Sequence, residues 1–276
     1  EKILFIVISK SGNTIETIEN FISFKIIKKN AKNIIIISEN KNNKLSKIVK
    51  KNNLYFIEHK NYIGGRYSVL SEVGLVPAYL MGLNIKKLRN NLGKYLKLGE
   101  TEHLAENSIF LGDLLKRNKY KNLIFLNYAP QLDNFLYWYQ QLIAESLGKK
   151  GKGFLPIIST APKDHHSLLQ LYLDGPKDKF FYIFSVENKK YKNVNINKIK
   201  EAQKFAAIKT LSKYNIPYRE FKITEPDEQS LGELFSYFIL ETAIIGKLVN
   251  INPFDQPAVE QVKTLTKKIL NSKSSK

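Results

Sequence analysis

Short apolar runs alternate with longer amphipathic segments along this chain, and this alternation most restricts the folds open to it. The run ILFIVI (3–8) is followed by a polar turn, an amphipathic segment (14–30) and a second apolar run, IIIIS (34–38). Buried strands that alternate with helices are typical of an α/β fold with a parallel sheet. Further strands are expected at 54–57, 122–127, 154–158, 179–186 and 217–223, and helices at 71–82, 101–117, 131–147, 199–214 and 228–249, with a short helix from about 165 and a last helix over 257–271.

A Lys- and Asn-rich stretch at 85–100 interrupts the alternation, which then begins again. With 276 residues, 43% of them hydrophobic, the chain is long enough to bury two cores. We therefore expect two domains, 1–90 and 91–276, of which the second ends in the helix that begins at Pro257. A proline is well suited to the first turn of a helix, where its missing N–H is not needed.

The chain is strongly basic, with 44 Lys and Arg against 25 Asp and Glu, a net charge of +19. Such a charge can support binding to nucleic acid or to an anionic membrane. The lysines are scattered among Asn and Ile, however, and no nucleic-acid motif accompanies them, so a compositional bias explains the charge more simply. We expect no nucleic-acid partner, whereas a positive field would attract a sugar phosphate.

Other features concern location and completeness. The absence of cysteine excludes disulfides and thiolate metal sites and fits a reducing cytoplasm. No apolar stretch reaches the length of about 18 residues that a membrane span needs. The chain begins at Glu1 and runs directly into an apolar strand without a signal-peptide cleavage site, so we expect an N-terminally incomplete cytoplasmic protein.

The stretch NYIGGRYSVLSEVG (61–74) combines two glycines, an arginine and the start of an apolar helix. Gly64 and Gly65 would permit backbone conformations closed to other residues and a close approach by a ligand. Arg66 would present its guanidinium to that ligand, and the helix that begins near Ser71 would add its positive N-terminal end. The segment favours binding of an anionic sugar, although an isolated Gly-Gly-Arg is more often a turn with a solvated arginine.

The segment SKSGNTIET (9–17) joins the first strand to the first helix and carries several hydroxyl groups. The amides at a helix N-terminus favour negative charge, and Ser9, Ser11 and Thr14 could donate hydrogen bonds to a phosphate. Ordinary N-capping is the alternative, since Asn13 and Glu16 have the spacing of a capping box.

Two segments of the second domain carry groups suited to proton transfer. In QLIAESLGKKGKGFLP, Gln141 and Glu145 lie four residues apart on one helix face, near the helix end. In STAPKDHHSLLQLY, His165 and His166 precede a helix, and histidine exchanges protons near neutral pH. A solvated surface glutamate and a capping histidine are the alternatives. No cluster of residues has metal-ligand spacing.

The segment NPFDQPAVEQVKTLTKKI begins the C-terminal helix. Gln256 and Lys263 are seven residues apart, two helical turns on one face. By itself such a lysine is usually solvated.

Taken in their order along the chain, from residue 9 to residue 263, these five segments resemble the phosphoglucose isomerase family over nearly the whole chain. The resemblance implies two SIS-type doubly wound parallel sheets flanked by helices, with the site between the two domains at a dimer interface. It implies interconversion of glucose 6-phosphate and fructose 6-phosphate through a cis-enediolate, in glycolysis and gluconeogenesis, without a cofactor or metal. The residues that would bind substrate or its phosphate are Ser9, Lys10, Ser11, Thr14, Gly65, Gln141 and Gln256.

The family resemblance also assigns catalytic roles. Glu145 would be the base that moves a proton between C1 and C2, and Arg66 would stabilise the negative charge of the intermediate. His166, selected over His165 by the spacing from Asp164 to Ser167, and Lys263 would assist ring opening. In this family the histidine comes from the neighbouring subunit, so a homodimer is implied.

Three departures from the family pattern are evident. Glu72 occupies a position that is usually small, and AVEQVK replaces the usual GVELGK at the C-terminal helix. A glycine-rich segment that the family has upstream of the Ser9 loop is absent, so the activity is assigned to the intact protein and is not expected of these 276 residues alone. A noncatalytic SIS-type sugar-phosphate sensor is the alternative, but it would not need Glu145, His166 and Lys263 together.

Overall fold

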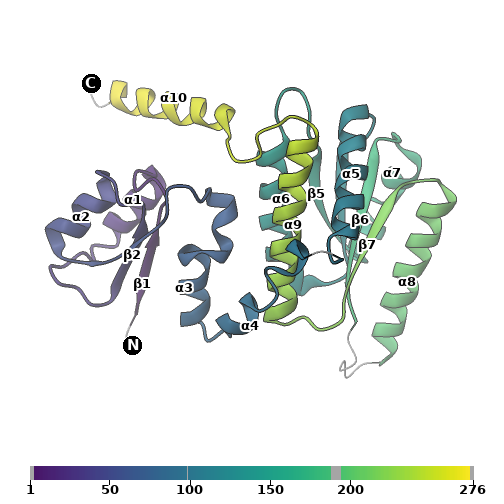
Figure 1. Ribbon diagram of the computed structural model, residues 1–276, viewed down its shortest axis with the longest axis horizontal. Helices are drawn as coiled ribbons and strands as arrows, with labels where there is room; N and C mark the ends of the chain where they lie inside the picture. The colour runs from purple at the N-terminus through teal and green to yellow at the C-terminus, as the bar shows by residue number, and fades with distance from the viewer. Residues whose placement is uncertain (1–2, 98, 188–193, 274–276) are drawn as a thin grey trace. The chain divides into compact units, whose positions relative to one another are not determined.

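The chain forms two compact units in the computed structural model, residues 1–91 and 92–276, here called the first and second units. The structure describes residues 3–97, 99–187 and 194–273. Each unit is built around a parallel β-sheet (Figure 1).

The first unit contains a parallel sheet with the strand order β1-β2-β3. Ile18 and Phe21 from the first helix pack against Ile34 and Ile36 of the central strand, and all four are buried. Because successive strands are neighbours and crossovers are right-handed, both crossover helices lie on the same face of the sheet. The elements are β1 Phe5–Ile8, α1 Ile15–Ser23, β2 Ile34–Ser38, α2 Lys44–Asn52, β3 Tyr55–Glu58, the 3-10 helix η1 Gly65–Leu70, α3 Glu72–Leu80 and α4 Ile85–Arg89.

The helices of this unit differ from the expectation in two places. The helix expected over 14–30 ends at Ser23, because the chain then enters the left-handed conformation at Lys25 and Asn30, with φ of 53° and 57°. Helix α2 was not expected at all. Asn43 and Ser46 form a capping box at its start, with the Asn43 Oδ1 accepting from the Ser46 amide at 2.8 Å.

The second unit contains a four-stranded parallel sheet with the order β5-β4-β6-β7. Its expected strands and helices are all present, although β5 continues to Thr160 and α8 begins at Val194 rather than 199. Its elements are η2 Lys94–Leu96, α5 Glu102–Arg117, β4 Asn122–Asn127, η3 Pro130–Leu132, α6 Asp133–Leu147, β5 Leu155–Thr160, η4 Lys163–His165, α7 Leu169–Asp174, β6 Lys179–Val186, α8 Val194–Lys213, β7 Tyr218–Ile223, α9 Glu228–Leu248 and α10 Pro257–Lys273.

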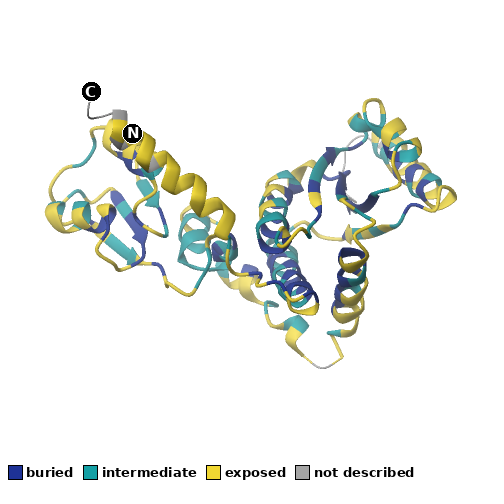
Figure 2. Ribbon diagram, turned by 90° about the horizontal axis from the view of Figure 1, so that it is seen from above, coloured by how far each residue is buried: buried dark blue, intermediate teal, exposed yellow. Residues whose placement is uncertain are grey.

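Helices cover both faces of this second sheet. On one face, Ile124 and Phe181 pack against Tyr172 of α7 and Leu211 of α8. On the other, the rings of β4 and β6 pack against α6 and α9; Phe125 of β4 and Tyr139 of α6, for example, have ring centroids 5.0 Å apart. The central strands β4 and β6 are buried, and the outer helix faces are exposed (Figure 2). The expected α/β fold with helix-flanked parallel sheets is confirmed.

Candidate functional site

The hydroxyl-rich loop lies at the carboxyl end of β1, directly before α1. Ser9 is buried, and its hydroxyl lies 2.8 Å from that of Thr14 across the loop. Gly12 adopts a φ of +62°, and a Cβ there would lie 2.2 Å from the Asn43 Oδ1. The loop is therefore closely packed against the start of α2, with its hydroxyl groups gathered at the N-terminus of α1.

The alternative, that this loop merely caps α1, does not match the geometry. Thr14 is the N-cap of α1 but makes no side-chain capping bond. The Asn13 Oδ1 accepts from the backbone amide of Lys44 at 3.1 Å, which ties the loop to α2. Ser11 is exposed, and Lys10 is half-buried with its Nζ 3.8 Å from the Glu39 carboxylate. The loop is therefore held against the start of α2 and does not simply cap α1, and phosphate binding there stays a prediction.

Arg66 lies in the first turn of η1 and is only 4% exposed, which is unusual for an arginine. Its guanidinium carbon lies 5.2 Å from the centre of the Tyr67 ring. Neither Gly64 nor Gly65 has a positive φ, so the expectation that they permit conformations closed to other residues is wrong. A Cβ at Gly65 would meet nothing within 4 Å, so this residue leaves open space beside the arginine.

Side-chain hydrogen bonds and close packing fix the segment around Arg66, residues 60–71, here called the arginine turn. The Ser68 hydroxyl donates to the Gly65 carbonyl at 2.6 Å, and the Ser71 hydroxyl donates to the Ser68 carbonyl at 2.8 Å. A Cβ at Gly74 would lie 1.9 Å from the Val69 carbonyl oxygen, so only glycine lets α3 approach η1 this closely.

Glu145 is half-buried in the last turn of α6 and lines a cleft of about 980 Å³. The Gln141 amide donates to its Oε1 at 3.0 Å, so the two residues share a helix face as predicted. The loop after α6 and the chain around the start of α10 form most of the rest of the cleft, and Lys149 joins them by an ion pair with Asp255 at 2.8 Å. A carboxylate held by an amide at the edge of a cleft can act as a general base.

The two adjacent histidines have different surroundings. The His165 Nε2 lies 2.7 Å from the hydroxyl of the buried Tyr128, and burial lowers the pKa of His165. His166 is exposed. Asp164 accepts from the Thr160 amide at 2.8 Å and from the Ser167 hydroxyl at 3.0 Å, which fixes the loop that carries both histidines. His166 is thus the more exposed of the two, while His165 is half-buried and held by Tyr128.

Glu145 and His166 lie at opposite ends of the strands of the second sheet. Helix α6 runs back from β4, so Glu145 is near the amino ends of the strands, whereas His166 follows the carboxyl end of β5. The two ends of β5, a strand of six residues, are about 20 Å apart. Within the second unit of a single chain, the two residues are therefore not brought together.

Gln256 and Lys263 are not both on the C-terminal helix. The helix begins at Pro257 as expected, so Gln256 precedes it, and the prediction that both residues share one helical face is wrong. Gln256 lines the cleft that also holds Glu145. Lys263 is exposed on α10, with its Nζ 2.7 Å from the Glu260 carboxylate.

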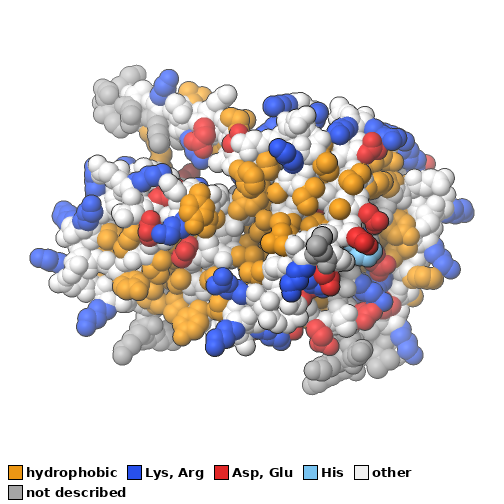
Figure 3. Space-filling view, viewed as in Figure 1, with side chains coloured by type: hydrophobic (Ala, Val, Ile, Leu, Met, Phe, Trp, Pro, Cys, Tyr) orange, Lys and Arg blue, Asp and Glu red, His pale blue; other side chains and the backbone are white. Residues whose placement is uncertain are grey.

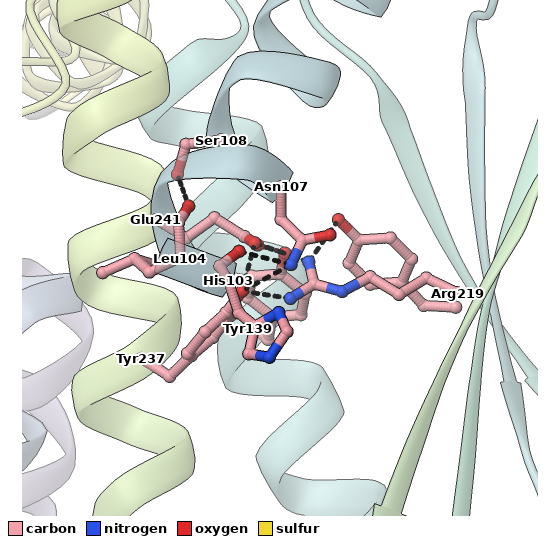
Figure 4. Close-up of polar contacts among 9 residues, drawn as sticks. His103, Leu104, Asn107, Ser108, Tyr139, Arg219, Tyr237 and Glu241 are labelled. Carbon is pink, nitrogen blue, oxygen red and sulfur yellow. Dashed lines mark hydrogen bonds and ion pairs between the residues drawn. The ribbon is translucent and has the colours of Figure 1, made fainter. Parts of the chain in front are cut away.

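A buried polar network in the second unit was not expected from the sequence (Figure 4). Glu241 is fully buried in α9; Arg219 of β7 pairs with its Oε1 at 2.5 Å and also donates to the Tyr237 hydroxyl. Burial opposes the charge on Arg219, but Glu241, Tyr182 and Tyr237 together outweigh it and raise the pKa of the guanidinium. Burial also raises the pKa of the Tyr139 and Tyr237 hydroxyls.

A second cleft, of about 860 Å³, opens beside this network between β7, α5 and α9. Its arginine already has a matching buried carboxylate, and several acidic side chains line the cleft, including Glu100, Glu225 and Glu233. This cleft does not suit an anionic ligand. The Arg219 network ties an edge strand to the helical layer and is structural.

Among the described residues, no group of three or more His, Cys, Asp or Glu side chains is placed to hold a metal ion. Within the same part of the chain, no helix has the length and apolar character needed to cross a membrane.

Comparisons with known proteins identify relatives of this chain. The family model described as phosphoglucose isomerase matches residues 1–155. The chain is 35% identical to the probable glucose-6-phosphate isomerase of Methanococcus maripaludis, over 98% of this chain and 66% of that protein. It is 34% identical to the glucose-6-phosphate isomerase of Methanocaldococcus jannaschii, over 96% of this chain and 71% of that protein.

The fold has a counterpart among solved structures. The crystal structure of a glucose-6-phosphate isomerase from Chlamydia trachomatis superposes with a TM-score of 0.81 at 20% identity, covering 98% of this chain and 60% of that one. The chain thus spans about two thirds of the length of the relatives it matches.

Proposed function

This chain belongs to the phosphoglucose isomerase family, and we propose on that basis that the intact protein interconverts glucose 6-phosphate and fructose 6-phosphate, in glycolysis and gluconeogenesis. The observation that carries the proposal is the joint presence of a hydroxyl loop at a helix N-terminus, a buried arginine in a fixed turn and a glutamate in a cleft. Each supports one step of an aldose–ketose isomerisation.

Substrate binding would begin at the phosphate. The hydroxyls of Ser9, Ser11 and Thr14 and the amides at the start of α1 are suited to its oxygens, and Lys10 adds positive charge nearby. Gly65 leaves room for the sugar beside Arg66. Binding at a group remote from the reacting carbons would hold C1 and C2 in place for the proton transfer.

The proton transfer would be carried out by Glu145, which takes the proton from one carbon and returns it to the other. Gln141 holds the carboxylate in position, and Gln256 lines the same cleft. Removal of the proton gives a cis-enediolate, whose negative charge the Arg66 guanidinium would stabilise. Because Arg66 is nearly excluded from water, the effective dielectric constant around it is lower than at the surface, and its attraction for the negative charge is stronger.

Ring opening would use His166 and Lys263, with His166 supplied by a second copy of the chain. Within a single chain, Glu145 and His166 are too far apart to act on the same substrate. This separation supports the homodimer, in which His166 of one chain would act together with Glu145 of the other. Helix α10 also exposes a row of apolar residues suited to a protein partner: Val259, Val262, Leu265 and Ile269.

The basic charge and the composition fit this function. Lys and Arg side chains are scattered among Asp and Glu on the face drawn in Figure 3. A dispersed positive field would draw in a sugar phosphate without forming a nucleic-acid track. The absence of cysteine from the sequence fits a cytoplasmic enzyme.

The test is isomerisation of fructose 6-phosphate by the full-length protein, with glucose 6-phosphate measured by a coupled dehydrogenase. We expect turnover in the wild type and a loss of kcat of about 10²–10⁴-fold in Glu145→Gln. Glu106→Gln, an exposed glutamate on α5, is the matched control and should retain full activity. Binding of fructose 6-phosphate without turnover in the wild type would favour a sensor and overturn the proposal.

A further inference from the structure

Two titratable groups lie at the two ends of the arginine turn: a buried histidine, and a half-buried glutamate whose Oε2 is inaccessible to water. His59 follows the last residue of β3, and Glu72 is the first residue of α3, so they bracket residues 60–71. His59 is 1% exposed and its backbone amide donates to the Ser38 carbonyl at 2.8 Å, which fixes it to the edge of the sheet.

Hydrogen bonding decides which nitrogen of His59 carries a proton. The Nε2 lies 3.2 Å from the Ile63 carbonyl oxygen, inside the arginine turn and directly before Gly64. A carbonyl oxygen only accepts hydrogen bonds, so the Nε2 must be the donor. The Nδ1 then faces the Glu72 Oε2 at 3.8 Å.

The Nδ1 and the Oε2 depend on each other. Both atoms are buried, and neither has a hydrogen-bond partner among the residues that the structure describes. Two buried acceptors facing one another would repel, and leaving a polar atom unpaired away from water is costly. At 3.8 Å the Nδ1 and the Oε2 are within ion-pair distance but beyond the reach of a hydrogen bond. A proton on either atom would turn their repulsion into an attraction that joins the start of α3 to the end of β3.

We propose that His59 and Glu72 form a brace that fixes both ends of the arginine turn and thereby positions Arg66; this inference rests on the proposed function. The inner bonds of Ser68 and Ser71 shape the turn itself. The brace sets where that turn lies relative to the sheet. His59 and Glu72 are positioning residues, since they act on the substrate through Arg66.

The experiment is a double-mutant cycle in the full-length protein with Glu72→Ala, His59→Leu and both together. Each single change leaves one buried polar atom without its partner, and we expect kcat to fall about tenfold or more because small displacements of a catalytic group are costly. The Michaelis constant should change much less, since the Ser9 loop that anchors the phosphate is a separate element.

The double variant distinguishes a brace from a direct role in catalysis. Replacing both members of a buried pair by apolar residues is often neutral, so kcat should return to within about threefold of the wild type. Glu72→Gln should also stay close to wild type, because its amide can donate to the Nδ1. Full activity in both single variants, or no recovery in the double variant, would overturn the proposal.

A spectroscopic measurement makes the brace testable without activity. Nitrogen-15 NMR of the imidazole should show a protonated Nε2 in the wild type and a changed Nδ1 signal in Glu72→Ala. An Nε2 without a proton would overturn the brace whatever the activity. A wild-type protein that shows the expected NMR signature but no isomerisation would instead refute the proposed function alone.

Discussion

Helix propensity alone predicts that Gly74→Ala stabilises the protein, whereas the packing of α3 on the arginine turn predicts that it destabilises the protein. Gly74 lies in the first turn of α3, and a Cβ there would be 1.9 Å from the Val69 carbonyl oxygen, well below the 3.0 Å that such contacts require. In Gly74→Ala the helix and the turn must therefore separate by more than 1 Å. The variant displaces the support of Arg66 without altering any polar group.

The magnitude follows from two opposing terms. Replacing glycine by alanine in an unobstructed helix stabilises by up to about 1 kcal/mol. Forcing extra volume into a packed site costs about 1–3 kcal/mol. Because the obstructing atom is backbone, we expect the second term to prevail and the free energy of unfolding to fall by about 1–2 kcal/mol. A displacement of this size should lower kcat about 10²-fold.

The assay combines thermal unfolding, followed by circular dichroism, with isomerase kinetics. For a unit of about the size of the first one, 1 kcal/mol corresponds to about 4–8 °C in Tm. Gly112→Ala in α5 is the matched control, since its Cβ would lie 3.5 Å from the Leu248 Cδ1, an ordinary contact. It should leave Tm unchanged or raise it and keep full activity. A Gly74→Ala protein as stable and as active as the wild type would refute the reasoning.

Three further predictions concern other elements. Gly12→Ala should raise the KM for the sugar phosphate about tenfold or more, measured by initial rates, because the residue has a φ of +62° and its methyl group would overlap Asn43; an unchanged KM would contradict this. Because burial lowers the pKa of His165, the unfolded chain binds the extra proton more readily, so stability should fall as the pH drops through about 6.5. Urea unfolding against pH should show a weaker dependence in His165→Gln, and an identical dependence would count against this assignment. Arg219→Met should lower the free energy of unfolding by about 3 kcal/mol, followed by fluorescence of the single tryptophan, because it leaves the Glu241 carboxylate buried without its cation; a loss below 1 kcal/mol would show that the pair is not needed.

The alternation of apolar runs was sufficient to predict the parallel sheets, because a buried strand needs a continuous apolar stretch. It did not reveal helix α2, whose Lys- and Asn-rich sequence resembles a loop. The informative signal there was local, since Leu45, Ile48 and Val49 lie on one helix face behind the Asn43 cap. The end of α1 depends on left-handed residues that no periodicity marks.

The candidate site was predictable only as separate segments. Sequence spacing identified Glu145 with Gln141, and the structure joins them. Spacing could not show that Arg66 is buried, or that the departure at Glu72 faces a buried histidine, because these facts depend on how β3, η1 and α3 pack together. The Arg219–Glu241 pair joins residues 22 positions apart across two elements, and no local motif announces it.

The most direct test of the central claim is isomerisation in deuterium oxide. The full-length protein and its Glu145→Gln variant would convert fructose 6-phosphate while proton NMR follows the hydrogens at C1 and C2. If Glu145 transfers the proton through a cis-enediolate, deuterium enters the product at C2, and the variant loses both turnover and exchange. Turnover and deuterium exchange that survive in the variant would show that Glu145 is not the base.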